Sequence, residues 1–447
     1  MKYQTIEMTE GSLAPNILQF TIPVMLMAMS QILFIACDDM LILGLFVGSK
    51  ALAAVGATNY LVNLFVNAFL GLSIGVNVIV AQYVGAKDSE KAGQTVHTAI
   101  ASGMVFGVIL LVLGFVCSRI CLEAMNTPSD IINQSTLYLR IYFFSTPATL
   151  IFNFGSAILR AQGDSKHPFL FLTVAGVADI ALNTFFVTVF RMGVAGVALG
   201  TVLSQILAAV LVLRHLIKEK GMCKLSLRKL KIHKEVFFQI LRLGIPAGLN
   251  NMVFSISNIQ IQSAINLFGS SAVAGCSASS TVEGFVYAAT NSVMQAAVSF
   301  TGQNTGAKKY ENVPKILRWC LLYTSVIGTV LGGLTYLLGR PVLSLFIGAE
   351  DIEYAMLRNG IVLLPYMFCG MMETFAGTLR GLGKSIMPTL VTLIGACGFR
   401  ILWVYVVFPA YRTLEVLFLC FPVSWILTTI AHYICYHVVI HRYKDIA

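Results

Sequence analysis

The chain has 447 residues, of which 57% are hydrophobic and only 11% are charged, and its formal net charge is +10. Soluble proteins average about 25% charged residues, so this composition excludes an ordinary soluble globular protein. Apolar segments follow one another almost to the C-terminus. Each segment is long enough to cross a bilayer as a helix, which requires about 20 residues. The sequence therefore predicts an all-α polytopic membrane protein.

About twelve spans are predicted, at residues 15–42, 52–82, 92–117, 131–158, 168–190, 193–215, 237–266, 274–302, 314–338, 353–380, 387–410 and 413–440. An even number of spans places both termini on one side of the membrane. Most of the 30 lysine and arginine residues fall in segments on that side. The positive-inside rule makes this side the cytoplasm. The basic excess is therefore explained by topology, and we expect no nucleic-acid partner.

Two adjacent aspartates, Asp38 and Asp39, lie in the first span, where no other side chain between Phe20 and Val47 is charged. A carboxylate at the bilayer centre costs roughly 2.5–3.5 kcal/mol on insertion scales. That cost is tolerated where the group faces a cavity, a partner or a transported ion. Because neighbouring side chains on a helix point about 100° apart, only one of the pair is expected to face the interior. We take Asp39 as the site residue and Asp38 as a secondary candidate.

The longest polar break, residues 218–235, divides the chain almost in half, and three motifs recur on either side of it. They are Ile22-Pro23 with Ile245-Pro246, Gln82-YV-Gly85-Ala86-Lys87 with Gln303-NT-Gly306-Ala307-Lys308, and Leu159-Arg160-AQ-Gly163-DSKH-Pro168 with Leu379-Arg380-GL-Gly383-KSIM-Pro388, at offsets of 223, 221 and 220. We interpret this as a duplicated six-helix unit, with lobes at 1–217 and 236–447. Copies of six spans share one orientation, which predicts a pseudo-twofold axis along the membrane normal and a site near the midplane between the lobes.

The basic segment 218–235 is expected to be a cytoplasmic linker. It either lies on the anionic inner leaflet or is positive only because of the topology rule. Cys223, within it, is expected to be accessible from the cytoplasm.

Polar residues of the fifth and sixth spans are further candidates. Asp179 and Asn183 are four residues apart, so they share one helix face. Thr201 begins a polar seam in the next span with Ser204. Carboxylate, amide and hydroxyl oxygens suit Na⁺, and a carboxylate can instead carry a proton. Asn183 and Thr201 could also serve only as hydrogen bonds between packed helices.

In the second lobe the possible secondary sites are Glu283, Glu373 and Arg400. Glu283 could reach a water-filled cavity or have a purely structural role. An unpaired guanidinium at Arg400 would be costly, so it needs a carboxylate or a carbonyl cluster, and Glu373 is a possible partner. Arg358 is assigned to the outer side.

Ten cysteines are present, without CxxC or CxxH spacing. We expect those within apolar spans to be small buried hydrophobic residues rather than disulfides or metal ligands. They are Cys37, Cys276, Cys320, Cys369, Cys397, Cys420 and Cys435.

A set of motifs resembles one known family. Asp39-MLIL-Gly44 is followed by Ala51-Leu52-Ala53-Ala54-Val55-Gly56 and then by Gly75 and Gln82-YV-Gly85-Ala86. With the Leu-Arg-x-x-Gly…Pro motifs before the fifth and eleventh spans, this set resembles the multidrug and toxic compound extrusion (MATE) transporters over nearly the whole chain. Asn250 and Asn251 stand where one branch has a seventh-helix acid, which favours the DinF-like branch, with coupling in the N-terminal lobe.

The resemblance implies twelve helices in two six-helix bundles, and export of organic cations and other drugs in exchange for Na⁺ or H⁺. Asp39 occupies the position of the first-helix acid, and Thr201 matches the sixth-helix threonine. Family members commonly carry Asn and then Asp in the fifth helix. Here Asp179 precedes Asn183, which moves the charge by one helical turn.

We therefore expect a secondary active exporter of drugs or metabolites, chiefly cationic amphiphiles, driven by H⁺ or Na⁺. It would be a monomer in the bacterial inner membrane, with no cofactor, no metal and no enzymatic activity. One alternative is a flippase for a lipid-linked precursor, although Arg140 and Arg400 make a poor cationic cavity for pyrophosphate. Another is a membrane-embedded enzyme, but the sequence has no HExxH or GxGD motif.

Overall fold

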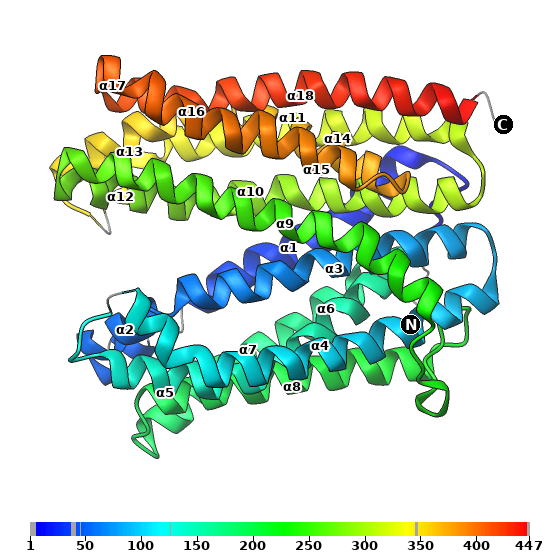
Figure 1. Ribbon diagram of the computed structural model, residues 1–447, viewed down its shortest axis with the longest axis horizontal. Helices are drawn as coiled ribbons and strands as arrows, with labels where there is room; N and C mark the ends of the chain where they lie inside the picture. The colour runs from blue at the N-terminus through cyan, green and yellow to red at the C-terminus, as the bar shows by residue number, and fades with distance from the viewer. Residues whose placement is uncertain (1–5, 37–41, 45, 126, 345–346, 445–447) are drawn as a thin grey trace. The chain divides into compact units, whose positions relative to one another are not determined.

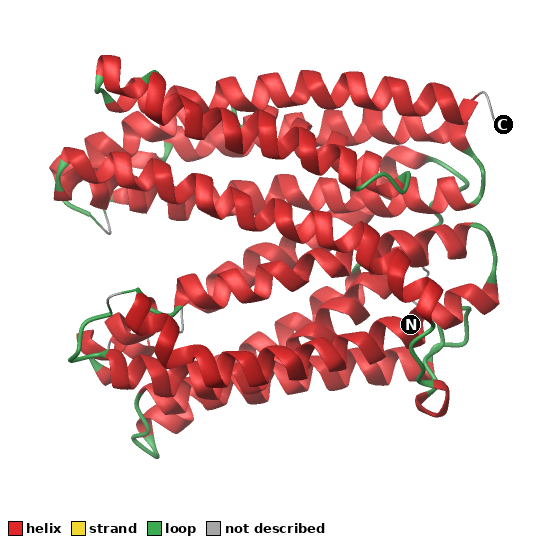
Figure 2. Ribbon diagram, viewed as in Figure 1, coloured by secondary structure: helices red, strands yellow, loops and turns green. Residues whose placement is uncertain are grey.

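Helices fill nearly all of residues 6–36, 42–44, 46–125, 127–344 and 347–444, which are the residues that this computed structural model describes, and no strand occurs among them (Figure 2). A long helical segment occupies each of the twelve predicted spans (Figure 1). Eight of these have the length and hydropathy of a membrane span, and α13 with α14 forms a ninth. The predicted all-α polytopic class is confirmed.

The first half of the chain contains α1 (Leu13–Ala36), α2 (Ser49–Gly56), α3 (Asn59–Gly85), α4 (Ser89–Ala124), α5 (Ile132–Tyr142), the 3₁₀ turn η2 (Phe143–Ser145), α6 (Thr146–Ala161), α7 (Lys166–Thr188) and α8 (Val194–Lys218). After the linker and its 3₁₀ turn η3 (Leu227–Lys229) come α9 (Lys234–Ile265), η4 (Asn266–Phe268), α10 (Ser270–Gly306), η5 (Tyr310–Asn312), α11 (Val313–Leu337), α12 (Gly339–Leu343), α13 (Ala349–Val362), α14 (Met367–Gly381), α15 (Ile386–Thr392), the π-helix η6 (Leu393–Gly398), α16 (Phe399–Val406), α17 (Phe408–Tyr411) and α18 (Leu414–Lys444).

Prolines interrupt two of the spans. Helix α5 passes through η2 into α6, whose second residue is Pro147. Pro365 lies between α13 and α14, which are bent by 49°. Proline has no backbone N–H, and its ring clashes with the carbonyl four residues earlier, so a helix bends or breaks just before it. The predicted spans 131–158 and 353–380 are therefore each built from two helices.

The duplication is visible in the helix packing. A Cβ atom on Gly107 of α4 would lie 2.3 Å from Pro147 Cα, and one on Gly328 of α11 would lie 2.9 Å from Met367 Cα. These residues correspond at offsets of 221 and 220, the offsets of the sequence motifs. Each copy thus uses a glycine at one position to let its third helix approach the break in its fourth, as small residues do in membrane bundles.

Two compact units divide the chain, and each includes the start of a helix from the other half of the sequence. Unit 1 contains Leu26–Gly248, and unit 2 contains Ile6–Met25 and Leu249–Ala447. Helix α1 therefore begins in unit 2 and ends in unit 1, whereas α9 does the reverse. The sequence instead predicted that each of these helices lies entirely within the lobe of its own half. Those predicted lobes are 1–217 and 236–447, around a linker at 218–235.

The exchanged helix starts are tightly packed. Phe20 of α1 meets Phe300 of α10 edge to face, with ring centres 5.8 Å apart, and the Tyr323 hydroxyl of α11 donates to the Ala14 carbonyl at 2.9 Å. In unit 1, a Cβ on Gly244 of α9 would lie 2.6 Å from the Cα atom of Leu72 in α3. Hydropathy assigns spans one at a time, so it could not predict this exchange.

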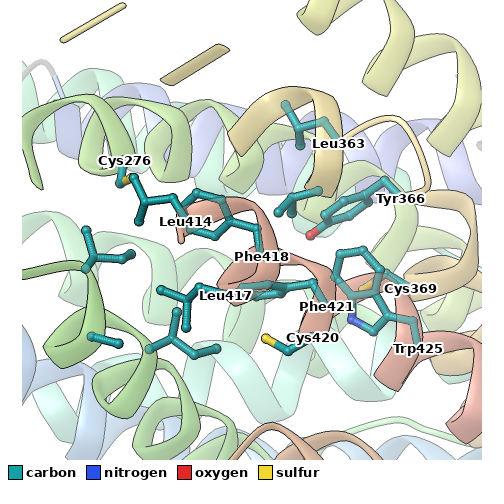
Figure 3. Close-up of a cluster of buried hydrophobic side chains, with 14 of the residues drawn as sticks. Cys276, Leu363, Tyr366, Cys369, Leu414, Leu417, Phe418, Cys420, Phe421 and Trp425 are labelled. Carbon is teal, nitrogen blue, oxygen red and sulfur yellow. The ribbon is translucent and has the colours of Figure 1, made fainter. Parts of the chain in front are cut away.

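An aromatic core lies in unit 2, where α18 packs against α13 and α14 (Figure 3). The rings of Tyr366 and Trp425 meet edge to face with centres 5.2 Å apart. Phe418 and Phe421 of α18 extend the same cluster, and Cys369 contributes its thiol (Figure 3). Edge-to-face pairs of this kind add about 0.5–1.5 kcal/mol beyond the area that they bury.

The start of the linker packs on unit 1. The amide of Leu225 donates to the Leu216 carbonyl at 2.9 Å, and the amide of Ser226 donates to His97 Nε2 at 3.1 Å. Cys223 is fully buried, so the prediction that it is accessible from the cytoplasm is wrong. The nine described cysteines are all free, as expected. Besides Cys223, the buried ones are Cys276, Cys320, Cys369, Cys397 and Cys420. Cys435 is partly buried, and Cys37 lies outside the described residues.

Candidate functional site

A polar cluster in unit 1 joins α7 to α8. Asn183 Nδ2 donates to Asp179 Oδ1 at 3.3 Å, and the Ser204 hydroxyl donates to the same oxygen at 3.1 Å. The backbone carbonyl of Thr201, at 2.9 Å, is a second acceptor within reach of Ser204. The Thr201 hydroxyl makes no hydrogen bond to another described residue. The structure thus brings together the predicted Asp179 and Asn183, with Ser204 joining them to α8, whereas Thr201 contributes only its backbone carbonyl.

Asn183 carries an unused acceptor beside this carboxylate. The residue is 0% exposed, and its Oδ1 has no hydrogen-bond partner in the described part of the chain. A Cβ on Gly200 of α8 would lie 1.8 Å from that oxygen, so glycine is what lets α8 pack against it. A buried acceptor without a partner costs about 1–3 kcal/mol. A proton donor or a cation at this oxygen would recover that cost.

A hydrophobic cluster involves the same two helices. Val187 of α7 and Val197 and Ala198 of α8 are buried in one hydrophobic cluster, against which Ile180 and Tyr142 pack. Asp179 itself is only partly buried, so an ion or a proton can reach its carboxylate beside this apolar surface. Charge on the Asp179 carboxylate is therefore sensitive to whatever ion or proton approaches it.

The predicted Asp38 and Asp39 lie outside the described residues, but the residues on each side of them contact α7. A Cβ on Gly176 of α7 would lie 2.2 Å from the ring of Phe34, near the end of α1. Ile42 and Leu43 are buried in the same cluster as Val187 of α7. The chain thus contacts the helix of Asp179 both before and after the aspartate pair.

A buried ion pair lies in unit 2. Arg358 Nη2 of α13 is 2.5 Å from Glu283 Oε2 of α10, and Arg358 Nη1 donates to the Ser279 hydroxyl at 2.8 Å. The Tyr366 hydroxyl donates to the other oxygen of Glu283 at 3.3 Å. Arg358 is only 5% exposed, so it is a buried residue of α13, and its assignment to the outer side of the membrane stays a prediction. Its position inside the predicted span 353–380 was the signal that it needs a buried partner.

Glu373 is not the ion-pair partner of Arg400. Glu373 Oε2 lies 4.0 Å from Arg380 Nη1 on the same helix. Arg400 Nε donates to the Ser424 hydroxyl at 3.0 Å, and its guanidinium lies 4.4 Å from the ring centre of Phe421, with two further aromatic rings at 5.7 Å. The expectation of a carboxylate or carbonyl cluster overlooked aromatic faces, which also stabilise a buried guanidinium.

The two units place opposite charges on equivalent serines. Ser204 and Ser424 are related by the offset of 220 residues. Ser204 donates to the carboxylate of Asp179, whereas Ser424 accepts from the guanidinium of Arg400. The same position of the duplicated unit thus contacts an anion in unit 1 and a cation in unit 2.

Comparison with known proteins gives two matches to one family model, described as MatE, at residues 23–185 and 246–406. The matches begin at Pro23 and Pro246, as the repeated motifs do. Among curated relatives, the chain is 29% identical over 386 residues to the probable multidrug resistance protein YoeA of Bacillus subtilis (strain 168), covering 85% of this chain and 83% of that protein. It is 20% identical to the multidrug export protein MepA of Staphylococcus saprophyticus, covering 85% of each chain.

Solved structures share the fold. An outward-facing multidrug resistance transporter of the MATE family superimposes with a TM-score of 0.90 at 20% identity, covering 100% of both chains. A MATE transporter crystallised in complex with MaL6 gives a TM-score of 0.92 at 19% identity, covering 99% of this chain and 100% of that one. The family model covers well over half of the sequence, and the chain therefore belongs to the MatE family of multidrug and toxic compound extrusion (MATE) transporters.

Proposed function

We propose that the protein is a secondary active exporter of drugs or metabolites, chiefly cationic amphiphiles, and that an inward flux of H⁺ or Na⁺ drives the export. The observation that carries the proposal is the Asp179 carboxylate in unit 1, which accepts hydrogen bonds from Asn183 and Ser204 and lies beside an Asn183 oxygen that has no hydrogen-bond partner among the described residues. Family membership and the names of the relatives, which describe multidrug resistance and export, support the same function.

The oxygens of this cluster suit either coupling ion. Na⁺ prefers hard oxygen ligands, and Asp179, Asn183 and Thr201 supply a carboxylate, an amide and a hydroxyl. A proton would bind only the Asp179 carboxylate, and the hydrogen bond that Ser204 donates to this carboxylate would then rearrange. Either ion removes the net negative charge of the pocket, and with it the attraction for a cationic drug.

Asp39 is the second carboxylate of the proposal. The described residues before and after it are Phe34, which lies against Gly176 of α7, and Ile42 and Leu43, which share a hydrophobic cluster with Val187 of α7. Coupling then requires that the ion and the drug stabilise different states of the protein. Loading of Asp39 and Asp179 from outside would favour the state that releases the drug outward. This scheme places coupling in the N-terminal half, as in the DinF-like branch.

The second-lobe arginines that could serve the alternative flippase function are both engaged. Arg358 is neutralised by Glu283, and Arg400 is enclosed by aromatic rings, so neither offers a free charge to a pyrophosphate. We further propose a monomer in the bacterial inner membrane with cytoplasmic termini, which the distribution of lysine and arginine supports.

Transport by purified protein in liposomes tests the proposal. A pH gradient and a Na⁺ gradient are imposed separately, and efflux of a fluorescent organic cation is followed. Asp39→Asn mimics the permanently loaded form, so it should fold but lose gradient-driven export, and Asp179→Asn should weaken coupling to a smaller degree. Asp130→Asn makes the same change at an exposed loop position and should export at the wild-type rate.

Two results would refute the scheme. Export by Asp39→Asn at the wild-type rate under the same gradient would show that Asp39 is not the coupling residue. Wild-type export that responds to neither gradient would exclude H⁺ and Na⁺ antiport together.

A further inference from the structure

Three metal-ligating side chains converge where α8 leads into the linker, away from the Asp179 cluster. Asp164 lies in the loop between α6 and α7, His167 in the first turn of α7, and His215 in the last turn of α8. One ligand atom from each residue lies within 4.8 Å of the other two. Their side chains are 13%, 19% and 24% exposed, so the group is mostly shielded yet can be reached from solvent.

Asp164 orients the group. Its Oδ1 accepts the backbone amide of His167 at 3.1 Å, which caps α7 and directs Oδ2 toward both imidazoles. Oδ2 lies 2.5 Å from His167 Nδ1 and 3.7 Å from His215 Nε2. A tetrahedral Zn²⁺ ion with ligands at about 2.0–2.2 Å keeps its donor atoms about 3.4 Å apart. The three donors are thus within small side-chain rotations of a metal-binding arrangement.

Glu219 is placed to complete the group. Its Oε2 lies 3.9 Å from His215 Nε2, while its Oε1 accepts the backbone amides of Lys220 and Gly221 at 3.0 and 3.1 Å. These bonds hold the carboxylate at the end of α8. It can become the fourth ligand, or that position can be taken by water as in open zinc sites.

The surroundings select the class of metal. A cavity of about 490 Å³ beside His215 is lined by Arg214, Lys218 and Lys220 as well as by Glu219. Hard cations such as Ca²⁺ or Mg²⁺ are held by several oxygen ligands, which this group of two imidazoles and one or two carboxylates does not supply. Two imidazole nitrogens with one or two carboxylates suit Zn²⁺ and its transition-metal neighbours, whose bonds to nitrogen are strong.

The ligands are not part of the duplicated scaffold. In unit 2, Lys384 stands at the position of Asp164, and both backbones form the same loop: the amide of Asp164 donates to Leu159, and that of Lys384 to Leu379, each at 2.9 Å. At the offset of 220, His167 and His215 correspond to Met387 and Cys435. The loop therefore forms without these ligands, and a structural role alone does not explain them.

We propose that Asp164, His167 and His215 bind a divalent transition-metal ion of the Zn²⁺ class, with Glu219 or water as the fourth ligand. The ion fastens the α6–α7 loop to the end of α8 and to the start of the linker. No metal site was predicted from the sequence, in which His215 lies 48 residues after His167 without any local ligand spacing. The site is independent of the proposed coupling residues, so each proposal can fail without the other.

The test uses full-length protein in detergent, purified without a histidine tag and stripped with a chelator. Calorimetry with Zn²⁺ should show one site with a Kd of about 1 μM or tighter. Co²⁺ in its place should give the intense visible bands of a low-coordinate ion. Asp164→Asn keeps a residue that caps helices well but removes the carboxylate, so it should weaken binding about 100-fold while the metal-free Tm stays unchanged.

His167→Asn and His215→Asn should show the same loss. The double variant His437→Gln, His441→Gln is the matched control, because it removes another neighbouring histidine pair, with ring centres 6.2 Å apart on α18. It should bind Zn²⁺ like the wild type. Absence of Zn²⁺ binding by the wild type, or binding that survives in Asp164→Asn and is lost in the control, would overturn the proposal.

Discussion

Removal of the Arg358 guanidinium should destabilise the protein strongly, because it leaves the Glu283 carboxylate without its counter-ion. Breaking a buried ion pair from one side costs about 3–5 kcal/mol. The contacts of this pair give a similar figure: Arg358 makes charge-assisted hydrogen bonds to Glu283 and to Ser279, and each is worth about 1.5–3 kcal/mol. We therefore expect Arg358→Met to lower the free energy of unfolding by about 3–5 kcal/mol.

Glu283→Gln should rescue much of this loss. A neutral amide needs no counter-ion, and it can still accept the hydrogen bond from Tyr366. The double variant Arg358→Met, Glu283→Gln should therefore be more stable than Arg358→Met alone. We expect a coupling energy of at least about 2 kcal/mol, within the range found for directly contacting pairs.

The assay is reversible unfolding in mixed micelles, followed by tryptophan fluorescence. Trp425 is a suitable reporter because it is 2% exposed and its ring centre lies 5.8 Å from that of Phe421, beside the ion pair. Arg340→Met is the matched control: Arg340 pairs with Glu353 at 2.8 Å, but the two side chains are 62% and 63% exposed. Exposed pairs contribute about 0–1 kcal/mol.

The reasoning would be refuted if Arg358→Met cost no more than Arg340→Met. Strictly additive losses in the double variant would also refute it, because they would show that the two groups do not interact in solution.

Three further predictions concern other parts of the chain. Gly200→Ala should cost about 1–3 kcal/mol and slow export, because its Cβ would displace the amide oxygen of Asn183. Cys223 should react with maleimide slowly from either side of the membrane, because burial raises the pKa of its thiol to about 12. The reactive thiolate fraction at neutral pH is then about 1,000-fold below that of a free cysteine, and the labelling rate should increase as the pH rises toward 12. Phe421→Leu should lower stability by about 1–2 kcal/mol, since it removes the ring face nearest to Arg400.

Each of these has a direct check. Gly333→Ala should be silent in unfolding and in transport, because a Cβ there would meet nothing within 4 Å. An exposed linker cysteine, Lys231→Cys, should label rapidly from the cytoplasmic side; fast labelling of Cys223 in the folded protein would contradict its burial. A Phe421→Leu loss that persists in full when Arg400 is replaced by Met would show that the ring does not act through the guanidinium.

The spans and the duplication could be predicted from the sequence, because both depend on features close together along the chain. Hydropathy locates a helix from about 20 consecutive residues. The pairing of Asp179 with Asn183 was predictable for the same reason, since residues four apart share a helix face. Motifs at a constant offset reveal a duplication without any knowledge of how its copies fold.

Partners that are distant along the chain could not be predicted in this way. Arg358 and Glu283 are 75 residues apart, and their contact depends on how α10 packs against α13. The error at Arg400 had another origin: a buried cation was given only oxygen partners, although aromatic residues are abundant in these spans. The convergence of Asp164 with His215 likewise depends on how α7 packs beside α8.

The exchange of helix starts between the units has a consequence for synthesis. The carbonyl of Ala14 accepts a hydrogen bond from Tyr323, which is 309 residues later in the chain. The carbonyl of Met8 accepts one from Asn304, which is 296 residues later. At about 5–20 residues per second, the ribosome needs roughly 15–60 s to supply those partners. During that interval the first helix is already made, but its start lacks the neighbours that α10 and α11 supply. Premature release of the chain after the linker would therefore leave an apolar, unpaired helix start, which membrane quality control could recognise.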